Sequence, residues 1–144
     1  MAADPAAPIR VLYAEDDPSD ADLTTTHFEA AAPEFEIEVV RTGETCLARL
    51  RDGAHDVLLL DNHLPDMDGV DVLRQLAELQ RRVPVVVTTS VGDESVAVQV
   101  LRLGAADYVP KAGEYLLRLP ALLRTVVAGC RSRGWPSAKT PVTP

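Results

Sequence analysis

Aromatic residues and basic charge are both scarce in this sequence. Aromatic side chains make up 4% of the 144 residues, whereas hydrophobic residues make up 47%, so the core must be built mainly from Val, Leu and Ala. An aliphatic interior of this kind is typical of parallel α/β sheets, and it leaves no aromatic platform for stacking bases. The net charge of −8 also argues against nucleic-acid binding, because phosphate contacts need clustered Lys and Arg. We therefore expect no direct nucleic-acid contact.

Long apolar runs and close cysteine pairs are also missing. No apolar run approaches the roughly twenty residues that span a bilayer, and residues 1–8 lack the basic and apolar regions of a signal peptide. Cys46 and Cys130 lie far apart in the chain, without the Cys or His spacing of a metal or redox site. We expect a cytoplasmic protein with no membrane contact and two reduced cysteines.

Length and patterning predict one α/β domain. A chain of 144 residues can bury roughly two-thirds of its unfolded surface around a single core. Five apolar segments alternate with five helical patterns, which predicts a doubly wound, five-stranded parallel sheet flanked by five helices. The predicted strands are residues 9–14, 35–40, 57–60, 83–88 and 106–109. We expect the domain to span residues 9–130, with a flexible N-terminus at residues 1–8 and a flexible tail or linker at residues 131–144.

Acidic residues and prolines set the ends of the first helix. Asp17 is expected to cap it, with Pro18 at the first helical position, and the helix must stop before Pro33. Asp20 and Asp22 are expected only to cap the helix and compensate its dipole. The buried side of the helix is predicted to carry Leu23, His27, Phe28 and Ala31.

Three later features also shape the predicted helices and loops. Asp93 is expected to cap the fourth helix, and Asp66 and Asp68 are expected to shape the loop after the third strand. Pro120 argues against one long helix from Glu114, because proline lacks an N–H and clashes with the preceding turn. A short turn at residues 115–118 is expected instead, followed by a final helix from near residue 120 to near residue 129.

Polar groups follow four of the apolar strands: the acidic run at residues 15–17, then Asp61, Thr89 and Lys111. Ligands of open α/β sheets bind at the carboxyl ends of the strands, so these groups are expected to converge there. Two carboxylates about 4 Å apart repel by roughly 4 kcal/mol at an effective dielectric near 20, so Asp16 and Asp61 would need a positive partner. Mg²⁺ suits this need, because it binds one or two carboxylates together with phosphate oxygens. The sequence therefore predicts a phosphoryl site that uses Mg²⁺.

Four segments resemble the receiver domain of two-component response regulators. They are VLYAEDDPSD at residues 11–20, DVLLLDNHLPDMDGVDVL at residues 56–73, VPVVVTTS at residues 83–90 and GAADYVPK at residues 104–111. The resemblance covers the chain from about Ile9 to Val127. It implies a flavodoxin-like fold with the strand order 2-1-3-4-5.

The resemblance also implies a role for each site residue. Asp61 would accept a phosphoryl group from a sensor histidine kinase or a phosphotransfer protein. The magnesium ligands would be Asp16, Asp61 and the backbone carbonyl of His63, with Glu15 in support. Lys111 and Thr89 would contact the phosphoryl group, and Thr89 would couple it to Tyr108, which matches the aromatic switch residue of the family.

Partner binding would then change on the face formed by the fourth helix, the fifth strand and the fifth helix. A downstream protein is the expected partner, and a homodimer through the same face is also expected as an option. Such a domain phosphorylates and dephosphorylates itself at most, and we do not class it as an enzyme.

The sequence departs from the family pattern at two places. Most receivers carry a proline directly after the lysine, whereas here Ala112 follows Lys111 and Pro110 precedes it. A cis bond before a residue other than proline costs about 3 kcal/mol, so the Lys111–Ala112 bond is expected to be trans. Val91 stands two residues after Thr89, where some receivers have a polar residue that assists hydrolysis, so the lifetime of the phosphoryl group stays open.

Two other functions stay open from the sequence. A phosphatase of the haloacid dehalogenase type also forms an aspartyl phosphate, but it needs an acid two residues after the nucleophile, where this chain has His63. A receiver-like docking module that works without phosphate is the second alternative. The acceptor, the acids and the lysine are all present, which favours phosphorylation over docking alone.

Overall fold

Five parallel strands form one sheet, in the order β2-β1-β3-β4-β5. The strands are β1 (Ile9–Ala14), β2 (Phe35–Val40), β3 (Val57–Asp61), β4 (Val85–Thr89) and β5 (Asp107–Pro110). This computed structural model describes residues 8–79, 82–90 and 92–134. The predicted fold class and strand order are therefore confirmed.

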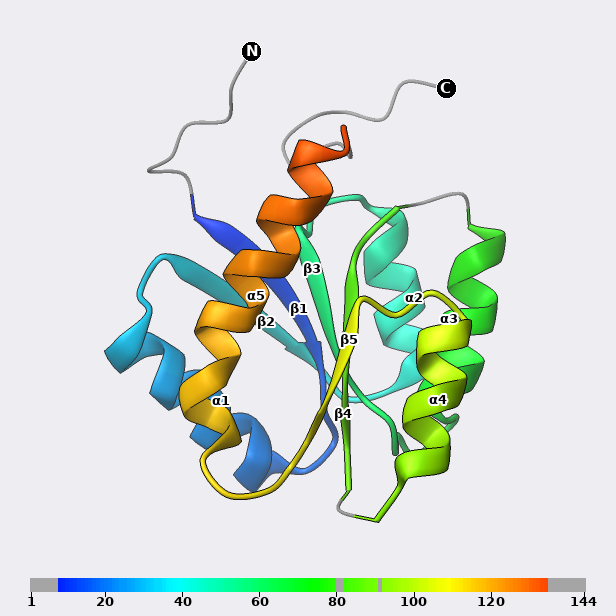
Figure 1. Ribbon diagram of the computed structural model, residues 1–144, viewed down its shortest axis with the longest axis horizontal. Helices are drawn as coiled ribbons and strands as arrows, with labels where there is room; N and C mark the ends of the chain where they lie inside the picture. The colour runs from blue at the N-terminus through cyan, green and yellow to red at the C-terminus, as the bar shows by residue number, and fades with distance from the viewer. Residues whose placement is uncertain (1–7, 80–81, 91, 135–144) are drawn as a thin grey trace.

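Helices cover both faces of the sheet (Figure 1). One face carries α1 (Pro18–Ala31) and α5 (Tyr115–Ser132), and the other carries α2 (Gly43–Arg51), α3 (Gly69–Glu78) and α4 (Glu94–Arg102). Successive residues of the central strands point alternately to the two faces. Leu58 and Leu60 pack toward α2, α3 and α4, whereas Leu59 packs toward α1 and α5. The continuous apolar run at residues 57–60 is thus buried on both sides of the sheet.

Two strands lie further along the chain than predicted. Pro84 has no N–H to donate, and its carbonyl accepts the N–H of Leu58, so the pairing of β4 with β3 begins at Val85. The strand ends at Thr89, one residue later than expected, and β5 is likewise shifted by one residue to Asp107–Pro110. Thr89 is consequently the last residue of the ladder, paired with Pro110.

The buried side of α1 differs from the prediction. Leu23 is 61% exposed, and the residues that face the sheet are Thr24 and Phe28. Thr24 can be buried because its hydroxyl hydrogen-bonds the Tyr13 hydroxyl at 3.2 Å. Phe28 also makes an edge-to-face contact with Phe35. A threonine satisfied by a partner on β1 therefore takes the place that the hydrophobic pattern assigned to Leu23.

The predicted break at Pro120 is wrong, because α5 runs without interruption from Tyr115 to Ser132. Pro120 is the sixth residue of the helix, so its missing N–H leaves one backbone carbonyl without a helical donor. Pro120 is buried, and Leu119 and Leu123 of the same segment are core residues against the sheet. Packing of this face outweighs the loss of one hydrogen bond. The helix also ends later than residue 129, and the rest of the expected tail, from residue 135, lies outside the described residues.

Acidic side chains fix several helix starts. Asp17 caps α1 as predicted, accepting the N–H groups of Ser19 and Asp20. Asp66, from the loop after β3, accepts the N–H groups of Gly43 and Glu44 at 2.8 and 2.9 Å and so caps α2 from a distance. These hydrogen bonds hold the pKa of Asp66 below its usual value, against the opposing effect of burial.

The cysteines and the hydropathy of the helices can both be read from the described residues. Cys46 and Cys130 are both buried and unpaired, in agreement with the prediction of two free thiols. None of the described helices combines the length and hydropathy that crossing a bilayer requires.

Candidate functional site

The candidate site lies at the carboxyl ends of the strands, where the direction of winding reverses between β1 and β3. Glu15 directly follows β1, Asp61 ends β3, Thr89 ends β4 and Lys111 directly follows β5. The Lys111 N–H donates to the Thr89 carbonyl at 2.8 Å, which ties the last two of these positions together.

Three carboxylates gather at this edge. Glu15, Asp16 and Asp61 each offer a carboxylate oxygen, and these oxygens lie within 4.8 Å of one another. Glu15 and Asp61 are buried, whereas Asp16 is exposed. Oxygen donors of this kind suit a hard divalent cation, and an exposed member leaves room for water ligands. The predicted carboxylates are thus brought together.

Lys111 lies against the same carboxylates. Its Nζ atom is 2.6 Å from Glu15 Oε1, 2.9 Å from Asp20 Oδ2 and 3.5 Å from Asp61 Oδ2, and its side chain is 19% exposed. Burial acts to lower the pKa of Lys111, but the hydrogen bonds to Glu15 and Asp20 outweigh it and raise the pKa above its ordinary value. Lys111 is therefore a cation at neutral pH.

Glu15 is the most deeply buried acid of the site, at 1% exposure of its side chain. Burial raises the pKa of Glu15 to about 7, and the neighbouring Asp61 adds to the rise while Lys111 opposes it. The Tyr13 hydroxyl also donates to Glu15 Oε1 at 3.4 Å. The pKa of Glu15 therefore lies well above the ordinary value of a glutamate side chain.

The loop after β3 holds Asp61 in place. The His63 N–H donates to Asp61 Oδ1 at 3.2 Å. Gly69 packs closely where this loop returns: a Cβ atom there would lie 3.1 to 3.2 Å from Asn62, which would have to shift by a few tenths of an ångström. The side chain of His63 reaches Asp93, with 3.2 Å between Nε2 and Oδ2. Asp93 stands at the N-cap position of α4, as predicted, but its carboxylate makes no cap hydrogen bond to the helix and contacts His63.

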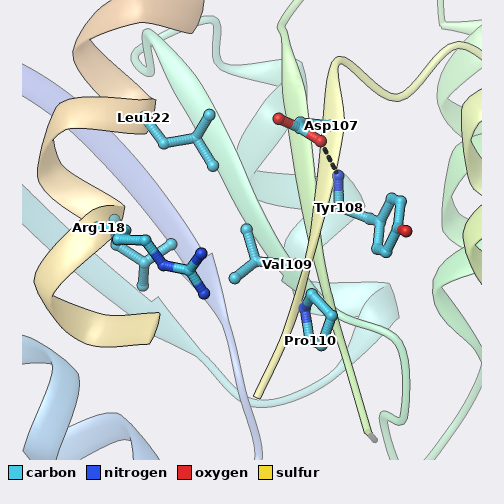
Figure 2. Close-up of a pocket in the computed structure, with 7 residues that line it drawn as sticks. Asp107, Tyr108, Val109, Pro110, Arg118 and Leu122 are labelled. Atoms are coloured by element: carbon cyan, nitrogen blue, oxygen red, sulfur yellow. Dashed lines mark hydrogen bonds between the residues drawn. The ribbon is translucent and has the colours of Figure 1, made fainter. Parts of the chain in front are cut away.

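Tyr108 and Thr89 lie on the same face of the sheet. Tyr108 pairs with Val87, two residues before Thr89 on β4, and its ring packs against the core beside α4. Figure 2 shows this ring on the opposite side of β5 from Arg118 and Leu122, which line a hollow of about 240 Å³ between β5 and α5. Tyr108 is half-buried.

Sequence reasoning missed the position of Asp20. This residue was expected only to compensate the helix dipole, whereas its carboxylate contacts Lys111. The Lys111–Ala112 bond is trans, as predicted, and the described residues contain no cis peptide bond. Val91 lies outside the described residues.

Comparison with known proteins identifies the family. The model of the response regulator receiver domain matches residues 11–117. The chain therefore belongs to the response regulator receiver domain family, whose members are signalling domains of two-component systems.

Individual relatives agree with this assignment. The chain is 40% identical over 117 residues to the sensory transduction protein RegX3 of Mycolicibacterium smegmatis, a match that covers 79% of this chain and 50% of that protein. A CheY-like response regulator receiver domain protein from Methanospirillum hungatei superposes with a TM-score of 0.78 at 23% identity, covering 89% of this chain and 100% of the other. The phosphorylated cyanobacterial phytochrome response regulator RcpA gives a TM-score of 0.67 at 25% identity, covering 87% and 93%. The chain spans 22–54% of the length of the curated relatives it matches.

Proposed function

We propose that this chain accepts a phosphoryl group on Asp61 from a phosphorylated histidine of a sensor kinase or phosphotransfer protein. The observation that carries the proposal is the cluster at the strand ends, where Lys111 lies beside three mutually close carboxylates. A structural ion pair would need one carboxylate for one amine. Here four carboxylates, those of Glu15, Asp16, Asp20 and Asp61, stand against one amine, which leaves an excess of negative charge for a metal ion.

Asp61 is the nucleophile in this proposal. One of its carboxylate oxygens attacks phosphorus, the bond from phosphorus to the histidine nitrogen breaks, and the electron pair remains on the imidazole, which takes up a proton. The His63 N–H fixes one carboxylate oxygen, and Lys111 lies near the other. Lys111 then contacts a phosphoryl oxygen as a compact point charge, and Thr89 donates its hydroxyl hydrogen bond to the same group.

The acidic residues fit Mg²⁺. Asp16 and Asp61 would be direct ligands, together with the backbone carbonyl of His63, and Glu15 would support them. When bound, the ion would neutralise the charge that spreads over the transferring phosphoryl group. The chain's own residues supply the nucleophile, the amine and the hydroxyl.

The test of this proposal is the intact mass of the protein after incubation with a small-molecule phosphoryl donor. We expect wild type to gain one phosphoryl group in the presence of Mg²⁺ and to gain none after chelation. The Asp61→Asn variant should gain none under either condition, since the amide is not a nucleophile. Asp56→Asn, an acid at the opposite end of β3, is the matched control and should behave as wild type. Wild type that gains nothing with any donor would favour a docking module that works without phosphate.

We also propose that phosphorylation changes partner binding through Thr89 and Tyr108. The phosphoryl group adds roughly −1.5 to −2 charges at Asp61, which should draw the Thr89 hydroxyl toward it. The space beside Thr89 then favours an inward position of the Tyr108 ring, so the populations of two states shift. Val98 and Leu101 on α4 and Leu117 on α5 are exposed, which supports a docking role for the face of α4, β5 and α5. A downstream protein, or a second copy of the chain, would bind there in the cytoplasm.

Hydrogen exchange tests the switch. With Mg²⁺ and saturating beryllofluoride, a mimic of the phosphoryl group, we expect amide protection to change across α4 and β5 in wild type. Thr89→Ala should bind the mimic more weakly and, once saturated, should show a change less than half as large. Ser90→Ala, which removes the neighbouring exposed hydroxyl, should match wild type. An undiminished change in Thr89→Ala would refute the coupling through Thr89.

A further inference from the structure

The amine of Lys111 has three N–H donors, and three carboxylates surround it in the structure. Glu15 and Asp20 are the near partners, at 2.6 and 2.9 Å, whereas Asp61 is further away at 3.5 Å. The amine is therefore held toward β1 and α1, away from the proposed phosphoryl acceptor. Any phosphoryl oxygen on Asp61 has to compete for it.

Asp20 differs from the other acids of the site. It is the third residue of α1, and its side chain is 33% exposed. The group of carboxylates that could share one metal ion consists of Glu15, Asp16 and Asp61, and it does not include Asp20. If a cation bound among those three residues, Lys111 would therefore remain the counter-ion of Asp20.

We propose that Asp20 is a positioning residue that competes with the phosphoryl group for Lys111 and so lowers the affinity of the site for it. This inference rests on the proposed function. A phosphoryl group places up to two further negative charges at Asp61, and these attract the amine across the site. As Lys111 moves toward Asp61, Asp20 loses its counter-ion and its charge then opposes the new group. The first turn of α1 thereby sets how readily the domain becomes phosphorylated.

The test compares Asp20→Asn with Asp22→Asn in beryllofluoride titrations at fixed Mg²⁺. Both variants remove one negative charge from the start of α1, but the carboxylates that contact Lys111 in the described residues are those of Glu15, Asp20 and Asp61, and not that of Asp22. Asp20→Asn should bind the mimic about three- to tenfold more tightly than wild type, the effect of one unit charge several ångströms away. Asp22→Asn should stay within about twofold, and raised salt should reduce the gain. An affinity for Asp20→Asn that is equal to or weaker than that of Asp22→Asn would overturn the proposal.

A second measurement does not depend on phosphoryl chemistry. The chain has two lysines, Lys111 and Lys139, so lysine labelled with ¹³C gives two sets of ε-methylene signals that mutation can assign. In the metal-free protein, Asp20→Asn should shift the Lys111 signals, and Asp22→Asn should leave them in place. Unchanged Lys111 signals in Asp20→Asn would show that the contact does not form, and the inference would fail. Wild type that binds no beryllofluoride, with the lysine shift present, would instead count against the proposed function and, with it, against the competition for Lys111.

Discussion

Lys111→Met should lower the free energy of unfolding of the metal-free protein by about 2–4 kcal/mol at pH 8. Removing one partner of a buried ion pair costs about 3–5 kcal/mol, because the remaining charge stays buried. Here Glu15 is almost fully buried beside Asp61, whereas the exposure of Asp20 reduces the cost. Urea denaturation with and without Mg²⁺ measures the effect. Mg²⁺ should recover a large part of the loss, because it supplies positive charge to the same carboxylates.

The matched control for this prediction is Arg124→Met. Arg124 pairs with Glu34 on the surface, where both side chains are nearly half exposed, so its removal should cost less than about 1 kcal/mol. Lowering the pH below 6 should shrink the cost of Lys111→Met but not that of Arg124→Met, because Glu15 then takes up a proton. Equal costs for the two variants would mean that Lys111 does not compensate the buried acids.

The apparent affinity for Mg²⁺ should fall by up to about tenfold for each pH unit below 7, because one proton must leave Glu15 as the ion binds. Burial raises the pKa of Glu15 to about 7, well above its ordinary value of 4.5. The folded state therefore holds this proton more tightly than the unfolded state does. The resulting stability is fully present below about pH 4.5 and is lost as the pH rises through about 7. Mg²⁺ should consequently stabilise the fold much more at pH 8 than at pH 5.5.

Calorimetric titration of Mg²⁺ between pH 5.5 and pH 8 measures this dependence, together with the proton released on binding. Glu15→Gln should bind Mg²⁺ more weakly at pH 8, and its affinity should change less with pH. Glu44→Gln, an exposed acid at the start of α2, is the control and should keep the wild-type dependence. A steep dependence that survives in Glu15→Gln would assign the proton to another group.

Local patterns in the sequence were sufficient to predict the sheet and the residues at its carboxyl edge. The apolar run at residues 57–60 can be buried only in a central strand, and its end necessarily delivers Asp61 to the edge. Glu15 and Lys111 follow from the same reasoning, because each stands directly after a strand, and Asp16 is the residue after Glu15. Residues 35–40 alternate apolar and charged side chains, a pattern typical of a strand with one solvated face, and β2 lies at the edge of the sheet.

Contacts between distant segments account for what the sequence did not predict. Asp20 lies one helical turn before Thr24, which is buried against Tyr13, so the two residues share one side of α1 and Asp20 reaches Lys111. The cap that Asp66 forms on α2 joins positions more than twenty residues apart, and no local pattern indicates it. The helix through Pro120 persists because the core packing of its neighbours outweighs a local preference.

The measurement that tests the central claim most directly is the location of the phosphoryl group. Borohydride reduces an aspartyl phosphate to homoserine, and peptide mass spectrometry then shows which residue has changed. After incubation with a small-molecule donor and Mg²⁺, the proposal predicts homoserine at position 61 in wild type and at no position when Mg²⁺ is chelated. Homoserine at another acidic position, or unmodified Asp61 in protein that has gained a phosphoryl group, would contradict it.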